Sequence, residues 1–345
     1  MNVTADLGTN STRNITEDSI YIGNDKLAPV VFATAFLIIF GNTATLVSIK
    51  RSVSLQTKSN AFVASLAVAD LTVGFGLISY GLWLAPGTRE LVNKDLSVCI
   101  FLLSTAFSAI VVSILNMLLV AIDRLVFIDH PFFYMRVVTN KLIAASIIVS
   151  WMVGLSVGNS QWFIYKRIYP PQCVATIILP EIYFKYTAPW FYFVPCFAIF
   201  GIYINIARTA KRQREAIAKQ TVAGTFHFTS AQQRKTAKSN EKSWKAAKMM
   251  MTVFGVFFLS WTPRFVLYAI ASDEVNNTVP GVVFDLFLLL GLLNSGVNFL
   301  VYPLHNREFR KVFRQIFCSC LRPSTVVPAK SSFDDGRTHI STIHL

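Results

Sequence analysis

The stretch LSVCIFLLSTAFSAIVVSILNMLLVAIDRLVF, residues 96–127, decides the fold. It carries no charged side chain before Asp123, and it exceeds the roughly 20 residues that a helix needs to cross the hydrocarbon core of a membrane. A segment in that core must satisfy its backbone hydrogen bonds internally, which favours a helix. Residues 96–127 therefore predict a membrane-spanning helix with a charged pair, Asp123 and Arg124, near its end.

Six further apolar stretches share this character. They run over Leu27–Ile49, Ala61–Ala85, Leu142–Ile164, Tyr186–Ala207, Ala246–Ile270 and Val282–Leu304. Only 14% of the chain is charged, against about 25% in an ordinary soluble domain. The expected fold class is an all-α membrane protein, a seven-transmembrane helix bundle. The sequence shows no Gly-rich nucleotide loop, zinc-ligand cluster or nucleophile elbow, so an enzyme is not expected.

The positions of the basic residues predict the orientation. With the N-terminus outside, 24 of the 32 Lys and Arg residues fall on the cytoplasmic side, as the positive-inside rule requires. This accounts for the net charge of +14 without nucleic acid, and it attracts the inner face to anionic membrane lipid. Sequons at Asn2, Asn10 and Asn14 agree, because they favour a glycosylated outer tail. We expect a multi-pass protein of the plasma membrane with an extracellular N-terminus.

The chain divides into four regions, and none reads as a separate soluble domain. They are an extracellular glycosylated tail (1–26), a seven-helix transmembrane domain (27–304), a short amphipathic eighth helix (305–320) and a disordered cytoplasmic tail (321–345). The last region is rich in Ser and Thr, as disordered tails generally are.

The five cysteines separate by the side of the membrane. Cys99 and Cys173 face the oxidising exterior, where a disulfide between them is expected. Cys318 and Cys320 follow the seventh span on the cytoplasmic side, which suits palmitoylation. Cys196 lies in the middle of a span, and we interpret it as a small buried hydrophobe.

Polar side chains inside the apolar stretches point to function, because their burial is costly. Asp70 lies in the second span, where an unpaired carboxylate would be expensive. A cluster of Asn and Ser side chains with water and a cation would offset that cost. The candidates for this cluster are Asn42, Ser113, Asn116, Asn294, Ser295 and Asn298.

Short motifs in a fixed order show what the chain resembles. They are Asp123-Arg124-Leu125, Trp151, Pro195 with Tyr203, Phe257 with Trp261-Thr262-Pro263, Asn298-Phe299-Leu300-Val301-Tyr302, and Phe309 in the helix that follows. With this set, residues 27–320 resemble a rhodopsin-like (class A) G-protein-coupled receptor. The end of the seventh helix and Lys245-Ala246-Ala247-Lys248 make the scaffold most similar to the biogenic-amine receptors.

The resemblance implies a switch without chemistry of its own. Asp123 would hold Arg124 at rest, and an outward swing of helix six would free Arg124 to meet a heterotrimeric G protein. The residues implied in coupling and switching are Asp123, Arg124, Tyr203, Phe257, Trp261, Asn298 and Tyr302. The resemblance also implies an allosteric sodium ion that favours the closed state, in a pocket formed by Asp70, Ser113, Asn294 and Asn298. It further implies that phosphorylation of Ser and Thr in the tail recruits arrestin.

Three positions depart from the family pattern. Leu125 replaces the usual Tyr, and Phe299 replaces the usual Pro. Because Pro303 follows four residues later, the kink of helix seven is expected to move. Ser243 stands where many members carry an acid that pairs with Arg124. Without that acid the resting state has one constraint fewer, and we expect some ligand-independent signalling.

The expected ligand pocket departs from the amine receptors at its central position. Those receptors bind the ammonium through an Asp seven residues after the helix-three cysteine, and this chain has Ala106 there. Arg264 should lie at pocket level. Two interpretations of it stay open: an internal pair with Asp285 or Glu181, or an anchor for an acidic ligand. The expected lining is Ala106, Phe107, Ile110, Phe191, Trp261, Arg264, Phe265, Tyr268 and Phe284.

Three functions compete for this sequence. The leading hypothesis is a receptor that transmits an extracellular small-molecule signal to heterotrimeric G proteins. The second is a receptor-like partner or decoy that does not signal, which the missing amine Asp and helix-seven Pro leave open. The third is a transporter or channel, and an odd number of spans without inverted repeats argues against it. For most aromatic members of the pocket, ordinary helix packing is the competing interpretation.

Overall fold

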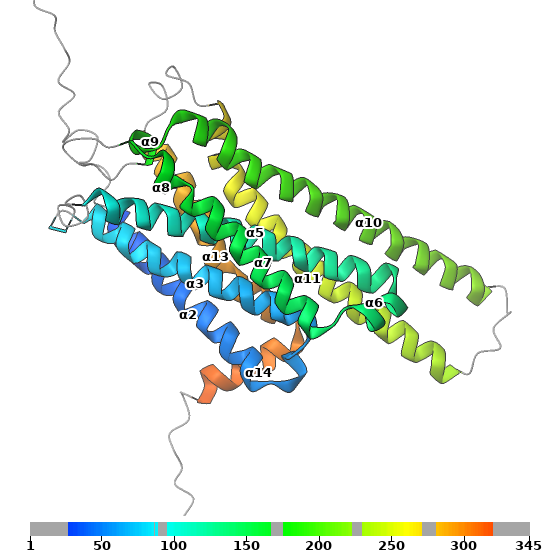
Figure 1. The fold of residues 1–345 in the computed structure, drawn as a ribbon. Coiled ribbons are helices and arrows are strands. Elements are labelled where there is room, and N and C mark those ends of the chain that lie inside the picture. The colour runs from blue at the N-terminus through cyan, green and yellow to red at the C-terminus, as the bar shows by residue number, and fades with distance from the viewer. Residues whose placement is uncertain are drawn as a thin grey trace, which may run out of the picture.

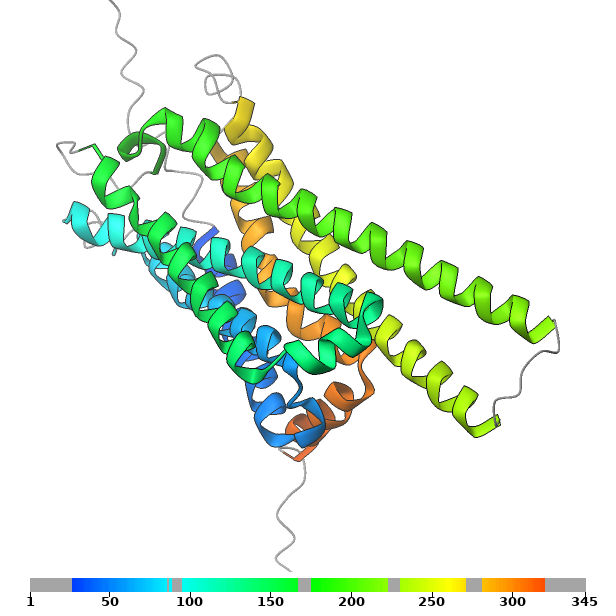
Figure 2. The same ribbon diagram turned by 45° about the vertical axis from the view of Figure 1, so that its right-hand side comes forward.

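The computed structural model describes residues 27–85, 87–88, 95–166, 175–222, 230–270 and 281–319. Over these ranges the protein is helical and contains no strand. Seven helices in the described ranges are long and apolar enough to cross a membrane. They lie side by side as one bundle in Figures 1 and 2. The predicted fold class is confirmed.

The helices follow the order of the apolar stretches. The long ones are α2 (Ala28–Arg51), α3 (Lys58–Leu84), α5 (Leu96–Asp129), α7 (Asn140–Asn159), α10 (Ala188–Val222), α11 (Ser230–Ile270) and α13 (Gly281–His305). The short ones are η2 (Val53–Leu55), α6 (Pro131–Val137), α8 (Gln161–Ile164), α9 (Ala175–Ile178), the π-helical turn η3 (Tyr183–Thr187) and α14 (Arg307–Ser319). We call the two ends of the bundle the α14 end and the η3 end (Figure 1).

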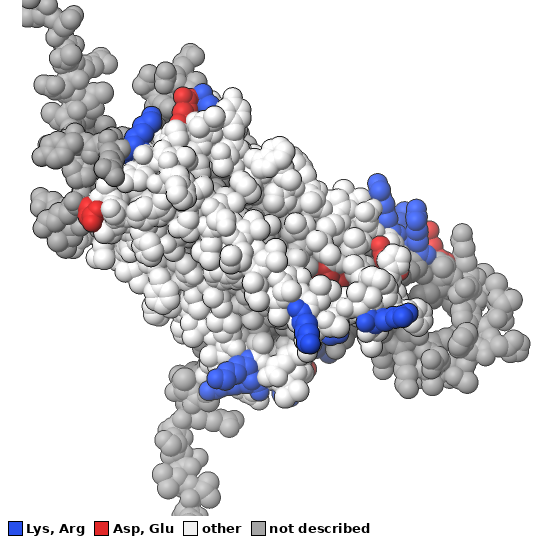
Figure 3. Space-filling view, in the orientation of Figure 1, with Lys and Arg blue, Asp and Glu red and all other residues white. Residues whose placement is uncertain are grey.

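The outer surface of the bundle is apolar between its two ends. Phe36, Phe75, Met152, Phe197 and Leu259, from five different helices, each expose more than half of their surface. So much exposed apolar surface is unusual for a protein in water, and it suits contact with lipid. Figure 3 shows the charged side chains at the ends of the molecule, with an uncharged band between them.

Polar caps fix where two of the long helices begin. The Thr57 side chain accepts a hydrogen bond from the Asn60 amide at 3.3 Å at the start of α3. Asp95 accepts one from the Ser97 amide at 2.8 Å at the start of α5. Each such cap stabilises its helix by about 1 kcal/mol. The two caps therefore mark the positions where the chain passes from a polar segment into an apolar helix of the bundle.

Two glycines allow α7 to lie directly against α5. A Cβ atom on Gly154 would come within 2.4 Å of the Val112 side chain, and one on Gly158 within 2.5 Å of the Ser104 carbonyl oxygen. Small residues spaced four apart are typical of close helix contacts in membranes. They hold α7 against the helix that carries the charged pair.

The main departure from the sequence prediction concerns α10 and α11. The apolar stretches ended at Ala207 and began at Ala246, whereas α10 continues to Val222 and α11 begins at Ser230. Both helices project beyond the rest of the bundle in Figures 1 and 2. The added residues are polar, so hydropathy does not detect them. They are rich in Ala, Lys, Arg, Gln and Glu, which are good helix formers.

Two short helices complete the α14 end. The helix α6 was not expected, and it begins at Pro131, whose fixed φ suits a first helical position. The helix α14 forms where the short amphipathic helix was predicted. It packs on α13 and α2, with Phe309, Val312 and Phe313 buried and Arg314 exposed.

Candidate functional site

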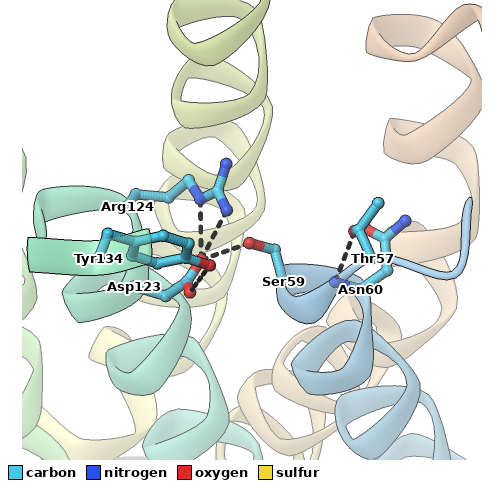
Figure 4. Close-up of polar contacts among 6 residues, drawn as sticks. All are labelled: Thr57, Ser59, Asn60, Asp123, Arg124 and Tyr134. Atoms are coloured by element: carbon cyan, nitrogen blue, oxygen red, sulfur yellow. Dashed lines mark hydrogen bonds and ion pairs between the residues drawn. The ribbon is translucent and has the colours of Figure 1, made fainter. Parts of the chain in front are cut away.

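At the α14 end, Asp123 accepts hydrogen bonds from three other side chains (Figure 4). Arg124 donates to its Oδ2 from Nη2 at 2.6 Å and from Nε at 3.1 Å. Tyr134 of α6 donates to Oδ1 at 2.8 Å, and Ser59 of α3 donates to Oδ2. The cluster therefore joins α3, α5 and α6. Tyr134 and Ser59 were not predicted, because no local sequence signal links them to Asp123.

Burial makes this cluster important for the stability of the protein. The side chains of Arg124 and Asp123 are 13% and 4% exposed, so removal of either would leave a charge in a poorly solvated place. Burial, followed by the charge of Asp123, raises the pKa of Tyr134 to about 12. The Tyr134 hydroxyl therefore remains a hydrogen-bond donor throughout the physiological pH range.

The two tyrosines expected in the switch are buried on separate helices. Tyr203 of α10 is 5% exposed and lies 6.1 Å from the Phe254 ring of α11, centroid to centroid. Tyr302 of α13 is 1% exposed and stacks on Phe309 of α14 at 5.4 Å. The structure thus places both in the core and ties Tyr302 to the amphipathic helix.

Asp70 lies at the centre of the bundle and is 1% exposed. Asn298 donates to its Oδ2 at 2.8 Å, which connects α3 with α13. Asn42 of α2 donates to the Ser295 carbonyl at 3.0 Å, and Ser113 lies beside the Asp70 carboxyl group. The structure therefore brings Ser113, Ser295 and Asn298 to Asp70, with Asn42 joined to Ser295. Asn116 donates to the Val112 carbonyl of its own helix, and Asn294 is buried on α13.

Several buried oxygen atoms in this cluster make no hydrogen bond. They include Asp70 Oδ1, Ser113 Oγ, Asn294 Oδ1 and Asn298 Oδ1. Each such atom is costly in a dry interior unless an ion or water meets it. One carboxylate oxygen together with neutral hydroxyl and amide oxygens is the kind of ligand set that hard cations prefer. The residues therefore fit a sodium ion.

Aromatic rings on α11 run between the Asp70 cluster and the η3 end. Phe257 and Trp261 lie 6.5 Å apart, and Trp261 and Phe265 lie 5.9 Å apart, centroid to centroid. Tyr192 of α10 stacks on Phe265 at 4.2 Å, and its hydroxyl donates to the Phe258 carbonyl at 2.9 Å. The same carbonyl also accepts a hydrogen bond from the Thr262 hydroxyl at 2.6 Å. Tyr192 was missed because its partners lie on another helix.

Other expected pocket residues lie on the facing helices. Phe107 of α5 meets Tyr183 of η3 edge to face at 5.4 Å, and Tyr268 lies 4.9 Å from the ring of Phe184. Tyr183 and Phe184 were not among the expected residues. The remaining members are partly buried, on α5 for Ala106 and Ile110, on α10 for Phe191 and on α13 for Phe284.

Arg264 is buried at the η3 end, with 8% of its surface exposed. Its Nε donates to the Tyr268 hydroxyl at 2.9 Å, and its Nη1 donates to the Phe284 carbonyl. The guanidinium carbon also lies 4.7 Å from the centroid of the Tyr268 ring and 5.7 Å from that of Phe284. These hydrogen bonds and ring contacts are all with neutral groups.

The two acids considered as partners of Arg264 make other contacts. Glu181 forms an ion pair with Lys185, one turn further along the chain. Asp285 accepts a hydrogen bond from Tyr80 of α3 at 3.3 Å. The structure therefore does not pair Arg264 with Glu181. It places Asp285 on α13, next in sequence to the Phe284 carbonyl that Arg264 contacts.

Phe299, which stands in place of the usual Pro, fills a space that a glycine provides. A Cβ atom on Gly41 of α2 would come within 2.0 Å of the Phe299 ring. The same ring stacks on Phe313 of α14, with centroids 6.5 Å apart. The helix α13 runs unbroken through Phe299 and contains Pro303. Phe299 therefore joins α2, α13 and α14.

Several predicted modification sites fall outside the described residues. These are the sequons at Asn2, Asn10 and Asn14, together with Cys173 and Cys320. Cys99 is buried and disulfide-bonded, and its pairing with Cys173 remains a prediction. Cys196 is a buried free thiol. Cys318 lies on α14 and Ser243 on α11, but their side chains are not among those described.

Comparison with known proteins defines the class. Residues 41–302 match the sequence profile of the 7 transmembrane receptor (rhodopsin family). The chain therefore belongs to the rhodopsin-like family of G-protein-coupled receptors, which are multi-pass membrane proteins and not enzymes. The resemblance stated from the motifs is confirmed.

Similar proteins within the family differ in ligand. The chain is 27% identical over 310 residues to the adenosine receptor A2a of Canis lupus familiaris, covering 84% of this chain and 71% of the relative. It is 27% identical over 328 residues to the alpha-1D adrenergic receptor of Rattus norvegicus, covering 85% and 58%. It is 25% identical over 337 residues to the pyroglutamylated RF-amide peptide receptor of Rattus norvegicus, covering 90% and 75%. These names support the family and do not assign a ligand.

Proposed function

We propose that this receptor carries an extracellular small-molecule signal to heterotrimeric G proteins, with its N-terminus outside and its α14 end in the cytoplasm. The observation that carries this proposal is the Asp123–Arg124 pair. It is buried at the α14 end and held by Tyr134 and Ser59 from two further helices. A guanidinium held by one carboxylate is a constraint that a bound partner can release.

The long helix α11 connects the two ends of the proposed switch. It carries Trp261 and Arg264 near the η3 end and continues to Ser230 beyond the α14 end. An outward swing of its lower part would separate it from α5 and α10, with which it makes contact. Such rigid movement of a packed element is a recognised way to convert ligand contact into a distant change. The projecting parts of α10 and α11 would then face the G protein.

A sodium ion around Asp70 is part of the same proposal. Asp70, Ser113, Asn294 and Asn298 would hold it through the oxygen atoms that make no hydrogen bond. A bound cation would compensate the Asp70 charge and favour the closed bundle. Even without the ion, the hydrogen bond from Asn298 to Asp70 connects α3 with α13 and stabilises the closed bundle.

Arg264 favours an acidic ligand over an amine. The scaffold resembles amine receptors, but Ala106 offers no carboxylate to an ammonium. Arg264 is buried and contacts only neutral hydroxyl, carbonyl and ring groups among the contacts that the structure defines for it. A ligand carboxylate would supply the charge-assisted hydrogen bonds that these groups do not.

The first test compares G-protein dissociation in cells for the wild type and Arg124→Ala. Both are measured without ligand and then with panels of amines and small carboxylates. We expect a signal from the wild type, including some without ligand, and none from Arg124→Ala. The matched control is Arg136→Ala, which removes an exposed basic side chain of α6 and should signal like the wild type.

The competing function is a receptor-like partner that does not signal. The replacement of Pro by Phe299 and the loss of the amine Asp keep it open. It becomes the better account if the wild type and both variants reach the cell surface and none dissociates a G protein under any condition. A response confined to amines would support the scaffold resemblance and reject Arg264 as the anchor.

A further inference from the structure

An aromatic ring of α13 occupies a niche in α2 near the α14 end. Phe299 is 7% exposed, and a Cβ atom on Gly41 would come within 2.0 Å of its Cδ1 atom and 2.4 Å of its Cγ atom. Because Cγ is the ring atom nearest the backbone, the ring could not swing clear as the end of a flexible side chain could. The lack of a side chain at Gly41 therefore lets Phe299 fit. Phe299 departs from the family pattern, so this contact is a property of this chain.

The helices α13 and α14 are joined into one unit beside this niche. Arg310 of α14 donates from Nε to the Pro303 carbonyl and from Nη2 to the Leu304 carbonyl, each at 2.9 Å. Carbonyl groups in the last turn of a helix have no partner within that helix, so these bonds satisfy the end of α13. The Phe299 ring also stacks on Phe313 of α14, with centroids 6.5 Å apart. A shift of α13 would therefore carry α14 with it.

The α13–α14 unit rests on α2 and η2. Phe299 supplies an apolar contact, and α14 lies against the end of α2 (Figure 1). Asn42 of α2 donates a hydrogen bond to the Ser295 carbonyl of α13 at 3.0 Å. Ser54 of η2 donates one to Glu308 of α14 at 3.1 Å, but this bond is exposed to solvent and adds little stability. Withdrawal of the Phe299 ring would therefore loosen the unit most at the α14 end.

The helix α13 also packs against α11. A Cβ atom on Gly291 of α13 would come within 2.6 Å of the Trp261 ring, so these two helices likewise meet through a ring and a glycine. The helix α13 is thus in contact with α2 and with α11, which swings outward in the proposed switch. If α13 follows α11, Phe299 has to leave the niche at Gly41. An occupied niche therefore favours the closed bundle.

We propose that Phe299 is a positioning residue, which holds the α13–α14 unit in the closed bundle through the niche at Gly41 and thereby limits signalling without ligand. The effect on signalling rests on the proposed function, whereas the contact can be tested without a G protein. Loss of the contact should raise the ligand-free signal of each receptor at the cell surface. A side chain that served stability alone would act in the opposite direction, because its loss would lower the amount of receptor and the signal together.

The first variant is Gly41→Ala, whose added methyl group cannot share the niche with the ring. We expect about a fivefold higher ligand-free dissociation of G protein per receptor at the surface, because overpacking of the niche penalises the closed state. The matched control is Gly76→Ala in α3, where a Cβ atom would meet nothing within 4 Å. That control should stay within about twofold of the wild type.

The second variant tests whether the two residues act together. Phe299→Leu should raise the ligand-free signal by about twofold on its own, because it leaves the niche partly empty. Combined with Gly41→Ala, it makes room for the methyl group, so the double variant should signal less than Gly41→Ala alone. Phe75→Leu, which alters a ring of α3 that is 58% exposed, is the matched control and should restore nothing in the Gly41→Ala background. Effects of Gly41→Ala and Phe299→Leu that simply multiply would overturn the proposal.

The G-protein-free measurement is hydrogen exchange of the α14 backbone amides in purified full-length receptor, followed by mass spectrometry. Exchange should be faster in Gly41→Ala than in the wild type and Gly76→Ala, and it should recover in the double variant, because local opening governs exchange. This pattern without a signal from any variant would support the contact and reject the proposed function. Unchanged exchange in Gly41→Ala, or a signal that falls in proportion to surface receptor, would overturn the positioning role of Phe299.

Discussion

The two ends of the bundle each shield an arginine from most of the solvent, but they surround it differently. At the α14 end, Arg124 forms an ion pair with Asp123 at 2.6 Å, and that carboxylate is held from two other helices. At the η3 end, Arg264 contacts the hydroxyl of Tyr268, the carbonyl of Phe284 and two ring faces. The first charge is compensated within the chain. The second makes its hydrogen bonds and ring contacts to neutral groups, and Asp285 of α13 lies in the same region, because both side chains act on Tyr80.

This difference gives the two arginines different roles. A compensated pair can be kept closed until a partner competes for it, which suits a switch. A buried guanidinium whose hydrogen bonds go to neutral groups can bind a ligand carboxylate through charge-assisted hydrogen bonds. The same side chain type therefore serves as a constraint at one end and as a recognition element at the other.

The largest expected effect concerns the Asp123–Arg124 ion pair at the α14 end. Replacement of Asp123 by Ala should lower the free energy of unfolding by about 3–5 kcal/mol, because it leaves the Arg124 charge buried without its partner. The measurement is denaturant titration of the purified receptor in mixed micelles. The control is Glu215→Ala, which breaks an exposed pair with Lys211 at 3.9 Å and should cost at most about 1 kcal/mol. Equal losses in the two variants would show that Asp123 and Arg124 are not coupled as described.

The sequence predicted the scaffold well for a physical reason. The membrane requires about 20 consecutive apolar residues for each span, so the seven helices appear in composition alone, and the position of Asp123 next to Arg124 is local. Tyr134 and Ser59 were not predicted because they reach Asp123 from other helices. The extensions of α10 and α11 were missed because polar helix formers carry no hydropathy signal. The neutral contacts of Arg264 likewise depend on how α11 and α13 pack.

The second prediction tests Arg264 at the η3 end. Arg264→Gln should raise the concentration of a carboxylate ligand needed for half-maximal response by about 10- to 100-fold, the loss of one charge-assisted contact of about 1.5–3 kcal/mol. Arg264→Lys should lose less, because the charge remains while the planar fork is lost. The control is Lys185→Gln, which removes a basic residue of η3 that is paired with Glu181. An unchanged response in Arg264→Gln would make Arg264 a structural residue.

The third prediction concerns the region between the ends. At a sodium concentration ten times the dissociation constant, the ion should stabilise the receptor by about 1.4 kcal/mol, seen as a higher midpoint of thermal unfolding. Asp70→Asn should abolish this gain, because it removes the one carboxylate of the cluster. Choline chloride at equal ionic strength is the control for the salt itself. A gain that persists in Asp70→Asn would place the ion elsewhere.

The smallest expected effect concerns Tyr134, which contributes one hydrogen bond to Asp123. Tyr134→Phe should lower the free energy of unfolding by about 0.5–1.5 kcal/mol at neutral pH. Its pH dependence has a definite sign, because the fold raises the pKa of Tyr134 from 10.0 to about 12 and thus favours the protonated hydroxyl. The difference in stability between the wild type and Tyr134→Phe should be constant below pH 10 and fall as the pH rises through 12.

The control for this titration is Tyr186→Phe, because the Tyr186 side chain is 68% exposed and should change stability little at any pH. A difference between the wild type and Tyr134→Phe that already falls between pH 6 and 9 would mean that another group titrates in the cluster. That outcome would make the α14 end a pH-sensitive site. A constant difference would instead leave the ion pair as a fixed constraint, which only a protein partner or a change in α11 can release.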